Sequence, residues 1–123
     1  MEDFIPFEMA KKLEEKGFSC KYPIAMYNEY NQLCPFYSFG TYYCDFGKQN
    51  SIAPTISQTL KWLRKEKNIY ISIFIDDDSN YPVTYEIYKG TECVCSHQGE
   101  YFTLENWNKC ELRALEYTLD NLI

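Results

Sequence analysis

Three side chains that can bind metal ions alternate in the second half of the chain: Cys93, Cys95 and His97. On a regular strand the two thiols and the imidazole would share one face, and Zn²⁺ could use them with Cys110 as a fourth ligand. Structural zinc sites usually take paired cysteines from a tight turn, whereas a flat strand spreads these ligands over more than about 12 Å. We therefore favour core cysteines beside an edge histidine, and expect neither a metal ion nor a cofactor.

The segment Asp76–Asn80 begins like a calcium-binding loop, with oxygen-bearing side chains at its first, third and fifth positions. The match then fails, because Tyr81 stands where the loop needs glycine and Ile87 stands where it needs glutamate. We interpret the segment as a solvated hairpin turn.

A basic cluster surrounds Trp62 and could in principle stack a base and hold phosphates. Its members are Lys61, Arg64, Lys65 and Lys67. At helical spacing these charges splay around the axis, Glu66 interrupts them, and the formal net charge of the chain is −6. A solvated helix face is favoured, and nucleic acid is not a favoured partner.

Trp62 lies off the apolar stripe of its predicted helix, on the side shared with Gln58 and Lys65. Three interpretations stay open: the flank of a broad core, a helix packed on two sides, or an exposed anchor for a partner. Tryptophan is prominent among interface hot spots. Trp62, Gln58 and Lys65 are therefore the candidate interface residues.

Glu111 falls on the apolar side of the last predicted helix and is the candidate pocket residue. A buried carboxylate could act in catalysis with a raised pKa, but more often it is hydrogen-bonded to the backbone or to a tyrosine. The chain has one histidine, and no second carboxylate is placed to form an acid–base pair with Glu111. We predict no catalytic residues.

The elements that would position these residues follow one another in the order αββαβββα. Helices are predicted from Pro6 to Lys16, from Thr55 to about Lys67 and from about Thr103 onward, with Thr55 and Gln58 at the spacing of a capping box. Strands are predicted over residues 22–30, 36–46, 69–75, 83–88 and 92–97, and the isoleucine-rich strand 69–75 is expected in the middle of a sheet. The prediction is one α+β domain over residues 1–123, with a mostly antiparallel sheet of about five strands, a hairpin plus a meander, on three helices.

Composition limits the class of protein. The 123 residues are 46% hydrophobic and 24% charged, which is a globular balance, and 18% aromatic with 12 tyrosines. A tyrosine-rich surface can stay soluble while offering contact area. The N-terminus lacks the pattern of a secretion signal and no stretch is long enough to cross a membrane, so we expect a cytoplasmic protein whose six cysteines are free thiols.

Two segments resemble a group of small proteins from gut-bacterial genomes, their phages and conjugative elements. Residues 53–64 (APTISQTLKWLR) are similar to that group's A-P-(T/L)-x-x-Q-x-(L/A)-x-W-(L/F)-R helix, and residues 110–115 (CELRAL) are similar to its terminal A-E-x-A-x-L helix, with Cys110 in place of alanine. The openings Phe4–Phe7 and Ala25–Asn28 are also similar to that group's first helix and first strand. The resemblance implies a bacterial or mobile-element origin and implies no activity.

Taken together, these observations predict a non-catalytic interaction module that binds a protein partner or itself, with a homodimer as one form and no membrane association. The competing hypothesis is a small-ligand-binding protein or enzyme with a tyrosine-lined pocket around Glu111.

Overall fold

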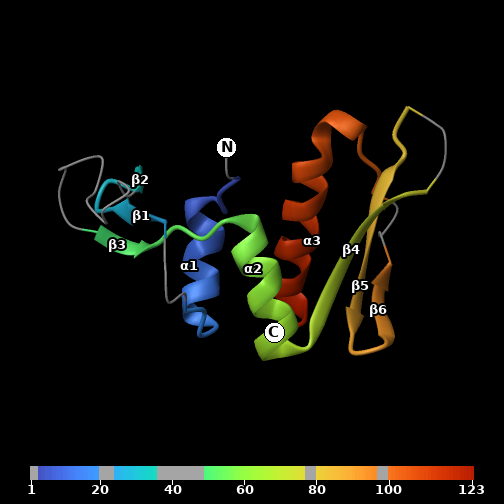
Figure 1. Cartoon of the computed structure of the whole chain (residues 1–123), viewed down its shortest axis with the longest axis horizontal. Helices are drawn as coiled ribbons and strands as arrows, with labels where there is room; N and C mark the ends of the chain where they lie inside the picture. Colours follow the sequence, from blue (N-terminus) through green and yellow to red (C-terminus); the bar gives the residue numbers. More distant parts are fainter. Residues whose placement is uncertain (1–2, 20–23, 36–48, 77–79, 97–99) are drawn as a thin grey trace. The chain divides into compact units, whose positions relative to one another are not determined.

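The computed structural model describes residues 3–19, 24–35, 49–76, 80–96 and 100–123. They form helices and antiparallel strands in an α+β arrangement, as the sequence predicts (Figure 1). The chain divides into two compact units, Met1–Gln58 and Thr59–Ile123, and each is described by itself.

The first unit begins with helix α1 (Phe7–Glu15). Gly17 followed by Phe18 predicts a Schellman cap at its end, and the helix ends in one. Gly17 takes a positive φ of 92°, which glycine adopts without strain. The N–H of Phe18 then donates to the carbonyl of Leu13 at 3.0 Å, and that of Gly17 to Glu14 at 3.1 Å. These are the two reversed bonds that define the motif.

A three-stranded antiparallel sheet follows, in the order β2-β1-β3. Strands β1 (Ala25–Asn28) and β2 (Leu33–Pro35) form a hairpin, whereas the second strand expected for a hairpin here, 36–46, lies wholly outside the described residues. Strand β3 (Gln49–Ile52) pairs with β1. Residues 47–51 are polar, carry no strand periodicity and predict a break, which is wrong for the residues of β3.

Asn28 organises the turn after β1. It is fully buried, and its Oδ1 accepts hydrogen bonds from the backbone N–H of Tyr30 at 2.8 Å and of Gln32 at 3.0 Å. Its Nδ2 donates to Oε1 of Gln32 at 3.1 Å. Asn31 adopts a left-handed φ of 61°, which asparagine tolerates well.

Helix α2 (Ile56–Trp62) continues as a π-helical turn, η1 (Leu63–Lys67), so the helical segment ends at the predicted residue. Asn68 closes it with a φ of 57°. The buried side chains differ from the predicted stripe, because Thr59 and Trp62 are buried while Leu60 is half-buried. A threonine counts as polar in a sequence pattern, yet here it belongs to the core.

In the second unit, β4 (Ile69–Ile75), β5 (Val83–Lys89) and β6 (Glu92–Ser96) form the predicted antiparallel meander. The strand order is β4-β5-β6, so β5 is the central strand. The expectation that the isoleucine-rich strand occupies the middle was wrong within the described residues, where β4 pairs with β5 alone.

The last helix, α3 (Trp107–Asn121), follows a short 3₁₀ turn, η2 (Leu104–Asn106), and packs on β5 and β4 (Figure 1). The hydroxyl of Thr103 is placed by the sequence to cap this helix, but its side chain makes no capping bond. Leu104 is the first leucine of the predicted apolar stripe, yet it is 58% exposed, so its expected burial was wrong. The buried positions of α3 are Cys110, Ala114, Leu115, Thr118 and Leu119. Small side chains on this stripe allow the helix to approach the sheet closely.

Candidate interaction surface

The two faces of the β4–β5–β6 sheet have opposite characters. Val83, Tyr85 and Ile87 alternate along β5 and are fully buried, on the face that carries α3. The residues between them point to the opposite side, which we call the outer face.

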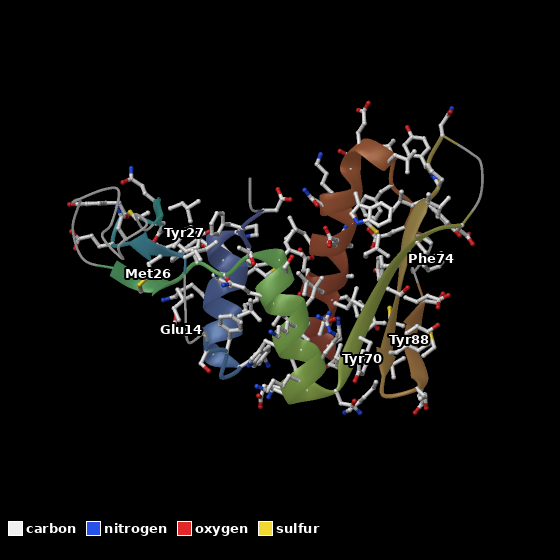
Figure 2. The ribbon with its side chains drawn as sticks, in the orientation of Figure 1. Glu14, Met26, Tyr27, Tyr70, Phe74 and Tyr88 are labelled. Carbon is white, nitrogen blue, oxygen red and sulfur yellow. The ribbon has the colours of Figure 1, made fainter. Side chains whose placement is uncertain are left out.

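Strand register arranges the outer face in rows. Tyr70 of β4 pairs with Tyr88 of β5, which pairs with Cys93 of β6. Figure 2 shows Tyr70 and Tyr88 toward one end of this sheet and Phe74 farther along β4. The full set is Tyr70, Ser72, Phe74, Thr84, Glu86, Tyr88, Cys93 and Ser96. Thr84 is the one fully buried member, and its hydroxyl donates to the carbonyl of Glu100 at 3.0 Å.

Much of the outer face is accessible. Tyr70 is 41% exposed, Ser72 and Ser96 are exposed, and Phe74 and Tyr88 are half-buried. Three aromatic rings on one accessible sheet face provide the kind of contact area that protein interfaces favour. The alternation of Tyr70, Ser72 and Phe74 was visible in the sequence, but which strand would lie beside it was not.

A hydrogen bond connects two neighbours on this face. The hydroxyl of Tyr88 donates to a carboxylate oxygen of Glu86, two residues earlier on the same strand. This bond, together with a smaller contribution from burial, raises the pKa of Tyr88, so the phenol stays protonated at neutral pH. The outer face therefore presents one carboxyl group, bonded to a phenol, among aromatic and hydroxyl side chains.

A β-bulge separates Cys93 from Cys95. The register of β5 and β6 shifts between Ile87 and Tyr88, so Cys95 pairs with Ile87 while Cys93 pairs with Tyr88. Neighbouring β5 residues point to opposite faces, and accordingly Cys95 is buried and Cys93 is exposed. The idea that both thiols line one face was wrong.

Nothing further supports a metal site within the described part of the chain. His97 lies outside it, and the described residues contain no group of three or more side chains able to hold a metal ion. Asp76 of the supposed calcium loop is exposed, and its N–H donates to the carbonyl of Pro82 at 2.8 Å. Residues 77–79 of that loop lie outside the described residues.

Titratable groups gather beneath α3. Burial raises the pKa of Cys110 to about 12, with further contributions from Glu111 and Glu100, and raises that of Tyr85 to about 12. The hydroxyl of Tyr85 is buried and has no hydrogen-bond partner among the described residues. At the surface, Nε of Arg113 donates to Oε2 of Glu100 at 2.6 Å. Both buried groups are held in their neutral, unreactive forms.

The predicted interface residues take other places. Trp62 is only 9% exposed, and Nζ of Lys67 lies 5.5 Å from the centroid of its ring. Gln58 uses its side chain in the capping box, and Lys65 is exposed. The burial of Trp62 removes the observation on which an exposed anchor depended, and the outer face supplies the exposed aromatic side chains instead.

The pocket candidate, Glu111, is half-buried on α3. Helical spacing predicts Asn108 on the same apolar side, but Asn108 is exposed. The stripe is centred on Cys110 and Ala114, which turns Glu111 toward its flank. The basic residues around Trp62 are exposed except for Lys67, which is half-buried.

Cys34 corrects the expectation of free thiols. It is disulfide-bonded, whereas Cys93, Cys95 and Cys110 are free. Cys20 and Cys44 lie outside the described residues. Spacing alone gave no reason to assign a bond to Cys34.

Comparisons with known proteins give no relative: no protein-family model, curated protein or solved structure matches the chain. None of the helices formed by the described residues has the length and apolar character needed to cross a bilayer.

Proposed function

We propose that this protein is a non-catalytic interaction module, an accessory protein of a bacterial chromosome or mobile element that works by contacting another protein chain. The outer face carries the proposal: Tyr70, Phe74 and Tyr88 are brought to one accessible side of a sheet whose other side is packed under α3. Aromatic residues are enriched where proteins bind one another, because they bury a large area for few rotatable bonds.

The chemistry of the titratable groups supports the same proposal. The buried groups Tyr85 and Cys110 have raised pKa values, which makes them poorer nucleophiles and bases at neutral pH. The exposed thiol, Cys93, lies on the outer face beside Tyr88. A contact surface accounts for this distribution more simply than an active site does.

Tyr88→Ala tests the proposal, because Tyr88 lies on the central strand and is half-buried at the surface. Tyr30→Ala is the matched control, since Tyr30 is 64% exposed on a turn of the first unit. Proteins that co-purify with the full chain from its host should be lost with Tyr88→Ala and retained with Tyr30→Ala. Identical sets from wild type and both folded variants would contradict the proposal.

A cytoplasmic location is part of the proposal. The three free thiols agree with a reducing compartment, but the disulfide at Cys34 is more typical of an oxidising one. Alkylation of intact cells, followed by mass spectrometry of the peptide that contains Cys34, distinguishes the two. A thiol at Cys34 is expected in the cytoplasm, and an intact disulfide in most molecules would place the protein elsewhere.

One observation favours the second candidate function, the binding of a small ligand. The Tyr85 hydroxyl has no partner among the described residues, and such a buried donor could bond to a ligand. A thermal-shift screen of metabolites against wild type, Tyr85→Phe and Glu111→Gln tests it. A compound that stabilises wild type alone would support ligand binding, and the absence of any such compound would contradict it.

A further inference from the structure

Strand β4 combines the sequence of a central strand with the position of an edge strand. It is seven residues long and contains no charge, proline or glycine between Ile69 and Ile75. Edge strands normally carry such residues, because an unpaired ladder would otherwise recruit another strand. Within the described residues, β5 is the one strand that pairs with it.

The hydrogen-bond pattern shows which backbone groups of β4 are left for a second strand. Gly90 N–H donates to the carbonyl of Asn68 at 2.9 Å, and Asp76 N–H donates to the carbonyl of Pro82 at 2.8 Å. Because direction alternates along a strand, the even-numbered residues of β4 direct their backbone groups to β5. The four isoleucines direct theirs to the opposite edge, called the free edge because no strand of the described residues pairs along it.

We propose that β4 pairs antiparallel with β4 of a second copy about a two-fold axis at Ser72, forming a homodimer with one continuous six-stranded sheet. The inference rests on the proposed interaction function and names its partner. A shift of one residue would pair the isoleucines of one copy with the outer-face residues of the other. Only every second register is therefore allowed. The register centred on Ser72 is the one that pairs all seven residues.

In this register Ile71 faces Ile73 of the second copy and Ile69 faces Ile75, which gives about eight main-chain hydrogen bonds at two for each such pair. Ile75, now 60% exposed, gains an apolar neighbour. On the outer face, Tyr70 comes opposite Phe74 of the second copy. Aromatic cross-strand pairs stabilise a sheet, so the outer faces of the two copies form one surface.

The two-fold axis brings the charged segment before β4 of one copy next to the oppositely charged segment after β4 of the other. Basic residues precede the strand, ending in Lys67, and Asp76 follows it. Antiparallel pairing about Ser72 places Asn68 opposite Asp76 of the second copy, with Lys67 next to them. Each end of the interface therefore joins a basic segment to an acidic one, whereas two parallel copies would bring like charges together.

Ser72→Lys is the decisive variant, and Ser96→Lys is its matched control. Both serines are exposed and both pair with Glu86, so either lysine gains a favourable neighbour within the chain. Only the lysine at position 72 would face its own copy across the two-fold axis. Light scattering and sedimentation of the full chain should give a dimer for wild type and Ser96→Lys, with a dissociation constant raised about tenfold or more for Ser72→Lys.

Cross-linking provides a second readout that does not depend on stability. Ser72 would face Ser72 of the second copy as a non-hydrogen-bonded pair, in which side chains are closest. With Cys93→Ser as background, mild oxidation should link Ser72→Cys chains into covalent dimers and leave Ser96→Cys chains unlinked.

Three outcomes would overturn the proposed dimer. They are equal cross-linking at both positions, a monomeric wild type at every accessible concentration, and equal effects of the two lysine variants. None of these outcomes would remove a Tyr88-dependent partner, so the failure of the dimer can be told from that of the interaction function.

Discussion

Thr55 and Gln58 satisfy each other's backbone amides across the first turn of α2. The N–H of Gln58 donates to Oγ1 of Thr55 and the N–H of Thr55 donates to Oε1 of Gln58, both at 3.0 Å. This is the predicted capping box, and it leaves neither donor unpaired at the helix start.

Thr55→Ala should lower the free energy of unfolding by about 1 kcal/mol, because it removes the hydroxyl that accepts the amide of Gln58. Urea denaturation followed by circular dichroism measures the change. Ser57→Ala is the control, since Ser57 is exposed in the same turn. If both variants lost the same amount, the cap would not contribute as the geometry indicates.

Asn28→Ala should destabilise the first unit by about 2 kcal/mol, since the amides of Tyr30 and Gln32 would lose their buried acceptor. Asn31→Gly should be nearly neutral, because glycine accepts the positive φ of 61° at that position. Limited proteolysis and thermal unfolding report on both variants. A neutral Asn28→Ala would mean that the turn does not depend on this side chain.

Tyr85→Phe should raise the free energy of unfolding by about 1 kcal/mol at neutral pH, because it deletes a buried hydroxyl that has no partner among the described residues. Chemical denaturation measures the difference. A loss of stability would show that the hydroxyl is hydrogen-bonded in the folded protein.

The raised pKa of Tyr85 should make the protein less stable in alkaline solution. The folded state raises the pKa of Tyr85 from its ordinary value of 10.0 to about 12, with burial as the main cause and Glu100 next. The folded chain thus holds this proton more tightly, so the stability is intact below about pH 10 and falls as pH rises toward about 12. Denaturation midpoints at about pH 8 and about pH 11 should differ more for wild type than for Tyr85→Phe. Equal differences would contradict the assignment.

The three free thiols should differ in reactivity. Cys93 is exposed, whereas Cys95 and Cys110 are buried and burial raises the pKa of Cys110 to about 12. Iodoacetamide labelling of the native protein, read by peptide mass spectrometry, should modify Cys93 first and the other two only on unfolding. Rapid labelling of Cys110 in the folded state would show that α3 does not protect it.

Local signals in the sequence predicted local structure well. The caps at Thr55 and Gly17 involve residues a few positions apart, so their geometry follows from residue type and spacing. The meander of β4, β5 and β6 was also predictable, because short polar turns separate apolar runs.

Features that depend on distant partners could not be read in the same way. Alternation showed that Ile69–Ile75 has an apolar side, but not that β5 would occupy the centre of the sheet. The bulge opposite Ile87 and Tyr88 turns the side chain of Cys93 to the face opposite that of Cys95, and no residue type in the segment predicts a bulge. The burial of Trp62 likewise depends on what packs around it.

Amide hydrogen exchange at Ile71 and Ile73 reports directly on whether β4 pairs with β4 of a second copy. Both N–H groups point to the free edge of β4, while those of Tyr70 and Ser72 point to β5 and serve as internal references. Pairing of β4 between two copies predicts slow exchange at Ile71 and Ile73 in concentrated protein and fast exchange on dilution, with the exchange of Tyr70 and Ser72 unchanged. Fast exchange of both amides at every concentration would contradict it.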